Sequence, residues 1–167
     1  MRRILTFLCT VTLLLSLCAC GRDRAELKEP VEFYFCNKEI VYHSPTGVVC
    51  SEAREGAGYT GELAALLRDY LKGPVSSDLY SMIPNGTSLL SCEEKQNSVI
   101  LEFSPQFAQL SGIKLSIACS CIVMTVHAYT GMETVHFRVE GSLLDNKSEM
   151  IVHLSDIVFM DTSVKKG

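Results

Sequence analysis

The spacing of hydrophobic and polar residues predicts the order of the elements along the chain. Val31, Phe33 and Phe35 alternate with more polar positions, which is typical of a strand. Residues 40–43 are a candidate partner strand. Residues 44–58 lose all periodicity and gather Gly, Pro, Ser and charge, so we predict a loop there.

The next pattern is one apolar stripe of a helix. Leucine and tyrosine recur at i, i+3, i+4, i+7 and i+8, which is typical of an amphipathic helix that lies on a sheet: Leu63, Leu66, Leu67, Tyr70 and Leu71. Gly73 follows as the C′ residue, and Pro74 forbids continuation of the helix. At the other end we expect Thr60 at the N-cap and Glu62 in the first turn.

A turn and a hairpin come after this helix. Pro84-Asn85-Gly86 is a turn that needs a positive φ at Asn or Gly. Strands are predicted at residues 87–92 and 97–103, joined by a polar tip. Within the tip, Glu93 and Glu94 are an adjacent carboxylate pair, the kind used in acid–base chemistry. We expect both to stay solvated with ordinary pKa values.

Residues 110–130 fit two patterns, because their apolar residues alternate like a strand and also line one face of a helix. A run of about 20 residues is too long for a typical strand of about 5 or 6, so a helix is predicted. Residues 134–139 then alternate as a strand, and residues 150–161 are an extended closing segment. The predicted fold is α+β in the order ββαββαβ, with two helices packed on one face of a mainly antiparallel sheet.

The start of the chain resembles a bacterial lipoprotein signal with its lipobox. Two arginines precede 14 apolar residues, Ile4 to Leu17, and small Ala19 stands directly before Cys20. Fourteen residues are short of the roughly 20 that span a membrane. The resemblance implies cleavage after Ala19, diacylglyceryl attachment to Cys20, and acylation of the new amino terminus in many species. The alternative is an uncleaved signal anchor.

Composition and charge set the domain organisation. We predict a signal peptide at residues 1–19, a polar lipidated tether at 20–30, a single domain at 31–161 and a C-terminal tail at 162–167. Beyond residue 19 there are 13 basic and 19 acidic groups, a net charge of −6. Such a body repels polyanions, which argues against nucleic acid as a partner.

Motifs for catalysis, cofactors and metals are sparse. Residues 56–61 match G-x-G-x-x-G, but residues 51–55 are too charged for the buried strand that a dinucleotide site requires, so we interpret a flexible glycine loop. The four histidines are scattered, at positions 43, 127, 136 and 153. His127, on a mostly apolar helix, is interpreted as a packing residue. We therefore predict no catalytic residue, cofactor or metal ligand.

Five cysteines remain beyond Cys20: Cys36, Cys50, Cys92, Cys119 and Cys121. None forms a C-x-x-C pair, so zinc or thioredoxin-type chemistry is not indicated. Two of them, at 119 and 121, lie on different sides of a helix, which prevents a mutual disulfide. Export allows a bridge between residues 36 and 50, but buried free thiols that behave as small apolar residues are favoured.

The stretch from residue 71 to 91 and the strand after it carry a family resemblance. The residues concerned are Leu71, Gly73, Pro74, Ser77, Leu79, Tyr80, Ser81, Ile83, Pro84, Gly86, Thr87, Leu89, Leu90, Ser91, Val99, Leu101, Phe103 and Ser104. They resemble the GerMN (Germane) domain of sporulation and germination proteins, over roughly residues 31–160.

The resemblance implies a small α+β domain similar to the ring-building modules of secretion and sporulation complexes, and a helix at residues 110–130. It implies no catalytic site, because the matching residues are explicable as turns, caps and core. The protein for which the family is named resembles two tandem copies of the domain, whereas this chain has room for one.

Three classes of function are left open. The first is a non-catalytic scaffold or interaction domain, lipid-anchored at the extracytoplasmic face of the bacterial cell membrane and active in sporulation, germination or envelope assembly. Its partners would be envelope proteins or peptidoglycan, and homo- or hetero-oligomers stay open. The second is an envelope hydrolase, which needs a convergent cluster of His, Asp, Glu or Ser. The third is a small-ligand-binding lipoprotein, which needs an enclosed pocket.

Overall fold

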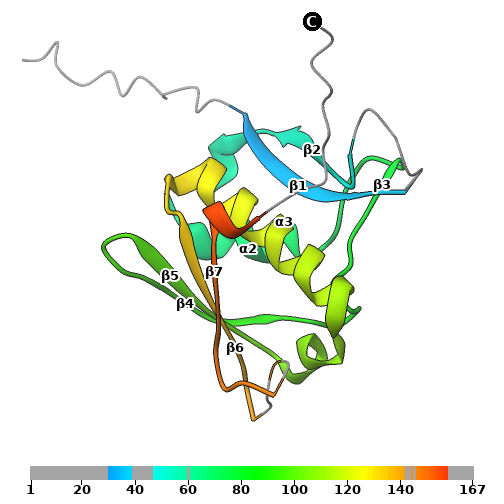
Figure 1. Ribbon diagram of the computed structural model, residues 1–167. Coiled ribbons are helices and arrows are strands. Elements are labelled where there is room, and N and C mark those ends of the chain that lie inside the picture. The colour runs from blue at the N-terminus through cyan, green and yellow to red at the C-terminus, as the bar shows by residue number, and fades with distance from the viewer. Residues whose placement is uncertain (1–29, 39–46, 60, 142–143, 145, 158–167) are drawn as a thin grey trace, which may run out of the picture.

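The α+β class is confirmed by a computed structural model that describes residues 30–38, 47–59, 61–141, 144 and 146–157 (Figure 1). In chain order the elements are β1 (Val31–Asn37), β2 (Val49–Arg54), the 3-10 helix η2 (Gly56–Gly58), α2 (Leu63–Tyr70), β3 (Leu79–Tyr80), β4 (Leu89–Glu94), β5 (Ser98–Phe103), η3 (Pro105–Gln109), α3 (Gly112–Thr130), β6 (Thr134–Val139), β7 (Met150–His153) and η4 (Leu154–Asp156).

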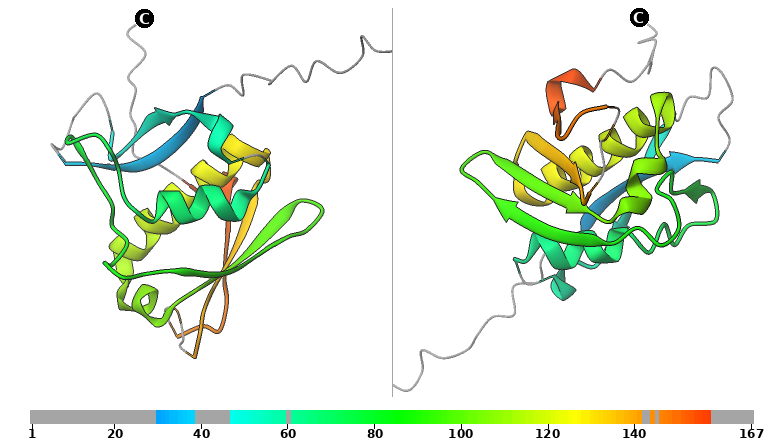
Figure 2. Two further views of the ribbon diagram at one scale, coloured as in Figure 1. Left: turned by 180° about the vertical axis from the view of Figure 1, so that it is seen from behind. Right: turned by 90° about the horizontal axis from the view of Figure 1, so that it is seen from below.

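The described strands form two sheets where one was predicted. One sheet has the order β2-β1-β3 and the other β4-β5-β6-β7. Every pairing is antiparallel except that of β5 with β6, so the mainly antiparallel prediction is confirmed. Figures 1 and 2 show α2 and α3 between the two sheets. A helix that buries more than half of its circumference, as α3 does, needs cover on more than one side, and a second sheet supplies it.

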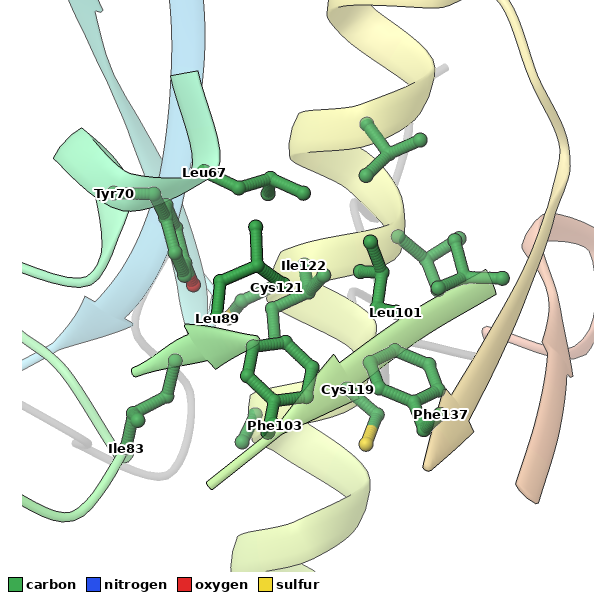
Figure 3. Packing of buried hydrophobic residues seen from close by; sticks show 14 of the residues in the cluster. Leu67, Tyr70, Ile83, Leu89, Leu101, Phe103, Cys119, Cys121, Ile122 and Phe137 are labelled. Carbon is green, nitrogen blue, oxygen red and sulfur yellow. The ribbon is translucent and has the colours of Figure 1, made fainter. Parts of the chain in front are cut away.

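The helix predicted at residues 110–130 is confirmed as α3. Its buried residues span about 200° around the axis at 100° per residue: Leu115, Ala118, Cys119, Cys121, Ile122, Val123, Thr125 and Val126. Among the described helices, α3 alone is long and apolar enough to cross a membrane by length and composition. In this fold it is the central core helix, and packing between the sheets accounts for its apolar character (Figure 3).

The helix predicted around residues 63–71 is also confirmed, with Leu63, Leu66, Leu67 and Tyr70 buried in α2. Gly73 has a φ of 90°, and its N–H donates to the carbonyl of Tyr70 at 3.0 Å, as expected of a residue that ends a helix. The N-cap prediction was wrong, because Glu62 occupies that position without a side-chain cap bond. Residue 60 lies outside the described residues.

The loop predicted at residues 44–58 was wrong over 49–54, which form β2. The strand pairs with β1 over its whole length, from Val31 opposite Arg54 to Cys36 opposite Val49. Edge strands tolerate charge, and here the tertiary pairing overrides the polar local sequence. The candidate strand at residues 40–43 lies outside the described residues.

The turn at Pro84-Asn85-Gly86 and the hairpin after it are confirmed. Gly86 has a φ of 83°, and the Thr87 N–H donates to the Pro84 carbonyl at 3.2 Å. β4 and β5 begin one or two residues later than predicted. At the tip, the hydrogen bond and charge of Lys95 lower the pKa of the exposed Glu93 carboxyl, which corrects our expectation of an ordinary value.

The closing segment predicted at residues 150–161 is extended only in part. β7 pairs with β6 over four residues, from Thr134 opposite His153 to Phe137 opposite Met150. The chain then turns through η4 (Leu154–Asp156). Residues 158–161 lie outside the described residues.

Candidate functional site

The residues of the family motif lie in turns, short strands and the core. Ser81 accepts a bond from the Ile83 N–H through its hydroxyl, and Pro84 accepts one from the Thr87 hydroxyl. The set is completed by the buried or half-buried residues of β3 and of the end of β5: Leu79, Tyr80, Phe103 and Ser104. Each of these contacts supports the backbone, and none forms a cluster of reactive groups.

Ser104 and Phe103 tie this motif to the rest of the fold. The Ser104 hydroxyl accepts the Ser88 N–H at 2.9 Å, and the Ser104 N–H donates to the Ser88 carbonyl at 2.9 Å. The Phe103 ring stacks on Phe107 with centroids 4.5 Å apart, next to Phe137 (Figure 3). The match to the motif therefore has a structural explanation at these positions.

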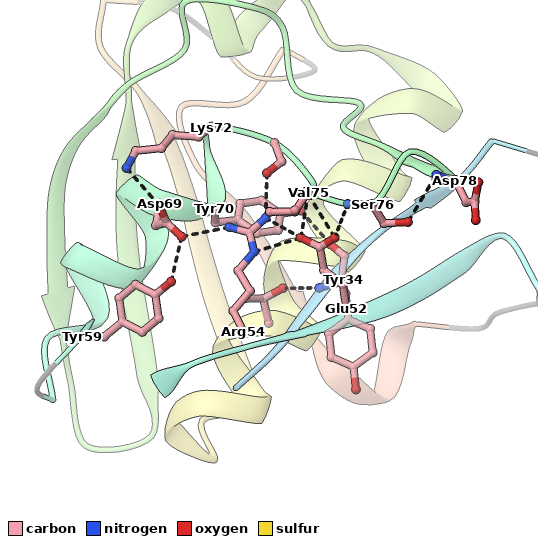
Figure 4. A network of polar contacts seen from close by, with 12 residues as sticks. Tyr34, Glu52, Arg54, Tyr59, Asp69, Tyr70, Lys72, Val75, Ser76 and Asp78 are labelled. Atoms are coloured by element: carbon pink, nitrogen blue, oxygen red, sulfur yellow. Dashed lines mark hydrogen bonds and ion pairs between the residues drawn. The ribbon is translucent and has the colours of Figure 1, made fainter. Parts of the chain in front are cut away.

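The described residues contain one dense polar cluster, which the sequence pattern did not predict (Figure 4). Arg54 lies at its centre, with its guanidinium 4.4 Å from the centroid of the Phe33 ring. It donates to the Glu52 carboxylate, to Asp69 Oδ2 at 2.9 Å and to the Gly73 carbonyl at 2.7 Å. We call these residues, together with Tyr59, the Arg54 network.

The Arg54 network holds the loop that follows α2. The Glu52 carboxylate accepts the Val75 N–H at 3.0 Å and the Ser76 N–H at 2.9 Å. Only 12% of the Arg54 and Glu52 side chains is exposed. One signal in the sequence could have revealed both the strand and the network. It is the alternation of the charged Glu52 and Arg54 with the small Ser51 and Ala53.

The pKa shifts agree with a network of permanent charges. Partial burial raises the pKa of Glu52, but hydrogen bonds from Ser76, Val75 and Arg54 outweigh it, so the net pKa is lowered. The same balance lowers the pKa of Asp69, where Tyr59, Lys72 and Arg54 donate. Burial and the bond to Asp69 raise the pKa of Tyr59 to about 12. These groups keep one charge state near neutral pH and do not transfer protons.

A cavity of about 600 Å³ lies beside the network, between the end of β1, β2 and the loop before β3. It is lined by Asn37, Lys38, Cys50, Ser51, Glu52, Ser76, Asp78 and Leu79. Its three charged groups have partners within the fold: Lys38 donates to the Ser77 carbonyl, Glu52 accepts from the loop, and Asp78 accepts from the Ser77 hydroxyl at 3.4 Å. The cavity therefore lacks the convergent unpaired charges that would orient a small ligand.

The described histidines are separate and are engaged in local contacts. His127 Nδ1 lies 3.3 Å from the Met132 carbonyl, which confirms it as a packing residue. His136 Nδ1 is 3.4 Å from Glu149 Oε1, and His153 Nδ1 is 2.9 Å from the Thr134 hydroxyl. Residue 43 lies outside the described part of the chain. Within that part, no group of three His, Cys, Asp or Glu side chains is placed to hold a metal ion.

The outer face of the four-stranded sheet presents polar and apolar side chains in rows. One row crosses all four strands through Glu93, Ile100, His136 and Ile151, and the next contains Ser91, Glu102 and Arg138. The alternate residues, such as Leu101 and Phe137, are buried on the side of the helices. We call these two rows the outer sheet face.

The outer sheet face combines charge with exposed apolar surface. Ile151 is 48% exposed, and Arg138 contacts Glu149 at 2.7 Å while 47% of its side chain stays exposed. Figures 1 and 2 show both helices on the opposite side of this sheet. A mixed surface of this kind, with aliphatic side chains among polar ones, is typical of protein interaction sites.

The predicted lipidation site, Cys20, and the cleavage site, Ala19, lie outside the described residues. No disulfide joins any two of the described cysteines at positions 36, 50, 92, 119 and 121, in agreement with the thiols favoured from the sequence. Burial raises the pKa of Cys119, and burial with the nearby Glu94 carboxylate raises that of Cys92 to about 11. Inert thiols of this kind fit a packing role.

Comparison with known proteins agrees with this picture. The sequence model of the Germane family, described as sporulation and spore germination, matches residues 32–145. No curated protein is significantly similar to the sequence. The fold is similar to the first GerMN domain of the Bacillus subtilis sporulation protein GerM, with a TM-score of 0.52 and 18% identity over 71% of this chain and 90% of that one.

Two further structures share the fold. The tandem GerMN domains of the same protein match with a TM-score of 0.51 and 19% identity, over 68% of this chain but 39% of the tandem chain. A Clostridium perfringens protein, provisionally described as a lipoprotein, matches with a TM-score of 0.50 and 18% identity over 79% of this chain and 93% of that one. Because the family model matches more than half of the sequence, the chain belongs to the Germane (GerMN) family of sporulation and spore germination domains.

Proposed function

We propose that this protein is a lipid-anchored, non-catalytic interaction domain at the extracytoplasmic face of the bacterial cell membrane. Its parts are a signal peptide at residues 1–19, a tether at 20–30 carrying lipid on Cys20, the domain at 31–161 and a tail at 162–167. It acts in sporulation, spore germination or envelope assembly. The basis for the process is the Germane family to which the chain belongs.

The observation that carries the proposal is the contrast between polar side chains held inside the fold and side chains left exposed on the outer sheet face. Glu52, Arg54 and Asp69 are bonded to one another or to the backbone, which leaves them no role as acid, base or nucleophile. The outer sheet face, by contrast, leaves Ile151 and Arg138 half exposed. A domain with this distribution is built to contact a partner through a surface.

The partner is an envelope protein, peptidoglycan or another copy of the domain. The outer sheet face carries Glu93, Glu102 and Arg138, and Glu149 lies beside it in contact with Arg138. Lys95 pairs with Glu93, so three acidic side chains face two basic ones and the charge is mainly negative. We infer that a protein partner meets this face with basic and apolar side chains. A nucleic acid is disfavoured by the net charge of −6 beyond residue 19.

The lipid anchor is tested by inhibiting lipoprotein signal peptidase in growing cells. We expect the wild-type protein to accumulate as a larger precursor and the Cys20→Ala variant to show no such shift. A Cys18→Ala variant is the matched control and is expected to be processed normally. Identical migration of the wild-type protein with and without the inhibitor contradicts the anchor.

The interaction role is tested by photo-crosslinking from the surface itself. A photoreactive amino acid replaces Ile151 on the outer sheet face or, as the control, Val75, which is 83% exposed on the loop after α2. We expect position 151, and not position 75, to give a defined crosslinked product in sporulating or vegetative cells. Equal yields from both positions, or none from either, contradict this surface as the site.

A further inference from the structure

Cys36 in β1 and Cys121 in α3 face each other in the core. The Tyr34 N–H donates to the Thr125 hydroxyl at 3.0 Å, and that hydroxyl donates to the Cys121 carbonyl at 2.8 Å. Two residues along a strand cover about 6.6 Å, and one turn of a helix covers about 6 Å. Pro30 and Val31 line a pocket together with Ala128 and Tyr129, so β1 and α3 run in opposite directions. The contact between residues 34 and 125 therefore brings Cys36 level with Cys121.

The two side chains are buried in the same part of the core. Only 1% of Cys36 and 2% of Cys121 is exposed, and both belong to the core cluster, in which Figure 3 shows Cys121. The interaction between the two thiols lowers the pKa of Cys36 and raises that of Cys121. Small side-chain rotations are enough to bring two thiols on facing elements to the separation at which a disulfide forms.

The fold separates the other candidate pairs. Cys50 lies opposite Phe35 in the β1–β2 register, and Cys36 lies opposite Val49. Because neighbouring residues of a strand project to opposite faces, Cys36 and Cys50 point away from each other. Cys119 and Cys121 are two residues apart on α3, about 200° around the helix axis.

We propose that Cys36 and Cys121 form a disulfide that ties β1 to α3 when the protein folds in an oxidising compartment. The bond would close a loop of 85 positions and fix the N-terminal strand of the domain to its central helix. Disulfides persist outside the cytoplasm, which agrees with the location that we propose. The disulfide proposal rests on the proposed location only for its oxidising environment. Formation of the bond requires the two thiols to meet and does not require the lipid.

The reaction is a two-step exchange with a disulfide oxidant such as glutathione disulfide. The Cys36 thiolate attacks one sulfur of the oxidant, which releases one glutathione thiolate and leaves a mixed disulfide. The Cys121 thiol then loses its proton and attacks the Cys36 sulfur, which releases the second glutathione. Two protein thiols are oxidised, one glutathione disulfide is reduced to two thiols, and the two protons lost by the protein thiols pass to the glutathione thiolates.

The environment of the pair favours Cys36 as the first nucleophile. The hydrogen bond from Cys121 lowers the pKa of Cys36, although burial opposes the shift. The same hydrogen bond and burial raise the pKa of Cys121. Because both thiols are buried, the oxidant reaches them during folding or in a transient opening of β1 from α3.

The test is to refold the full chain in detergent with an excess of glutathione disulfide over glutathione. After acid quenching and alkylation, peptide mapping is expected to find residues 36 and 121 linked and the other described cysteines alkylated. The melting temperature is expected to be about 10 °C higher than that of the reduced protein. Alkylation of all five domain cysteines, or a bond between any other pair, overturns the proposal.

The variants separate the bond from general effects of oxidation. Cys36→Ala and Cys121→Ala are each expected to lose the linked peptide and the rise in melting temperature. Cys92→Ala, in the other sheet, is the matched control and should keep both. Should an alanine variant fail to fold, the mapping of the wild-type protein still decides the result. A rise in melting temperature that survives in Cys121→Ala also overturns the proposal.

Discussion

The two sheets of this domain hold their charged residues in opposite ways. On the three-stranded sheet, Arg54 and Glu52 face inward, are 12% exposed, and bond to each other and to the loop after α2. On the four-stranded sheet, Arg138 faces outward with 47% of its side chain exposed. The comparison shows that a charged residue indicates a contact surface only where the fold leaves its side chain exposed.

The largest change in stability is expected when the arginine of each sheet is removed, which tests this contrast directly. Arg54→Ala leaves Glu52 and Asp69 as half-buried charges and removes the bond to the Gly73 carbonyl. We expect it to lower the free energy of unfolding by about 3 kcal/mol. Arg138→Ala is expected to change it by less than about 0.5 kcal/mol, because its ion pair is exposed. Urea denaturation at pH 7 measures both, and equal losses would contradict the contrast.

The next test concerns the turn that leads from the first sheet into β4. Gly86 has a φ of 83°, a conformation that a β-branched residue avoids, although a Cβ there would meet only Gln106 Cγ at 4.0 Å. Gly86→Val is expected to lower the free energy of unfolding by about 2 kcal/mol through backbone strain. Thermal melting measures the change.

Gly58→Val is the control for that turn, because Gly58 is exposed, has no positive φ and has open space within 4 Å of the position that a Cβ would take. We expect it to cost less than Gly86→Val by about 1 kcal/mol or more. If Gly86→Val melts like the wild-type protein, the turn is a functional surface and not a structural one.

A pH titration extends the comparison to the charge state of the Arg54 network. The folded-state pKa values of Glu52 and Asp69 are lowered, so the unfolded chain binds more protons in acid. Their stabilisation is therefore present above the unfolded pKa values, 4.5 and 3.8, and is lost as the pH falls through the lower folded values.

The measurement is urea denaturation from pH 6 down to pH 3 for the wild-type protein and for Glu52→Gln. We expect the free energy of unfolding to fall more steeply with acid in the wild-type protein, because the variant has no carboxylate to protonate at residue 52. Glu102→Gln on the outer sheet face is the control and should keep the wild-type slope. Parallel curves for all three proteins would show that the network contributes no acid sensitivity.

The parts of this fold that depend on local pattern could be predicted from sequence. The stripe from Leu63 to Tyr70, the stop at Gly73 and the long run of α3 each carry their cause within a few residues. The hairpin after Gly86 is of the same kind. In these elements, spacing and turn residues agree with the tertiary structure.

The parts that depend on distant partners could not be predicted. β2 has a polar sequence, and it is a strand because β1 pairs with it and because Gly73, Val75 and Ser76 satisfy its charges. The division into two sheets follows from the way α3 is covered, which a strand count does not reveal. The proximity of Cys36 to Cys121 was missed for the same reason, since the two residues are 85 positions apart.

The smallest expected change in stability is the one that decides the function of the outer sheet face. Ile151→Lys adds a charge at a half-exposed site in the edge strand β7, so we expect the free energy of unfolding to stay within about 0.5 kcal/mol of the wild-type value. The same change should abolish crosslinking from a photoreactive group at the neighbouring register position, residue 136, because a lysine that loses its solvent in an interface with a basic partner costs affinity. Val75→Lys, on the loop held by the Arg54 network, carries the same added charge and should leave crosslinking intact. Loss in both variants would mean that net charge controls the interaction, whereas loss in Ile151→Lys alone places the contact on the outer sheet face, whose side chains the fold leaves exposed.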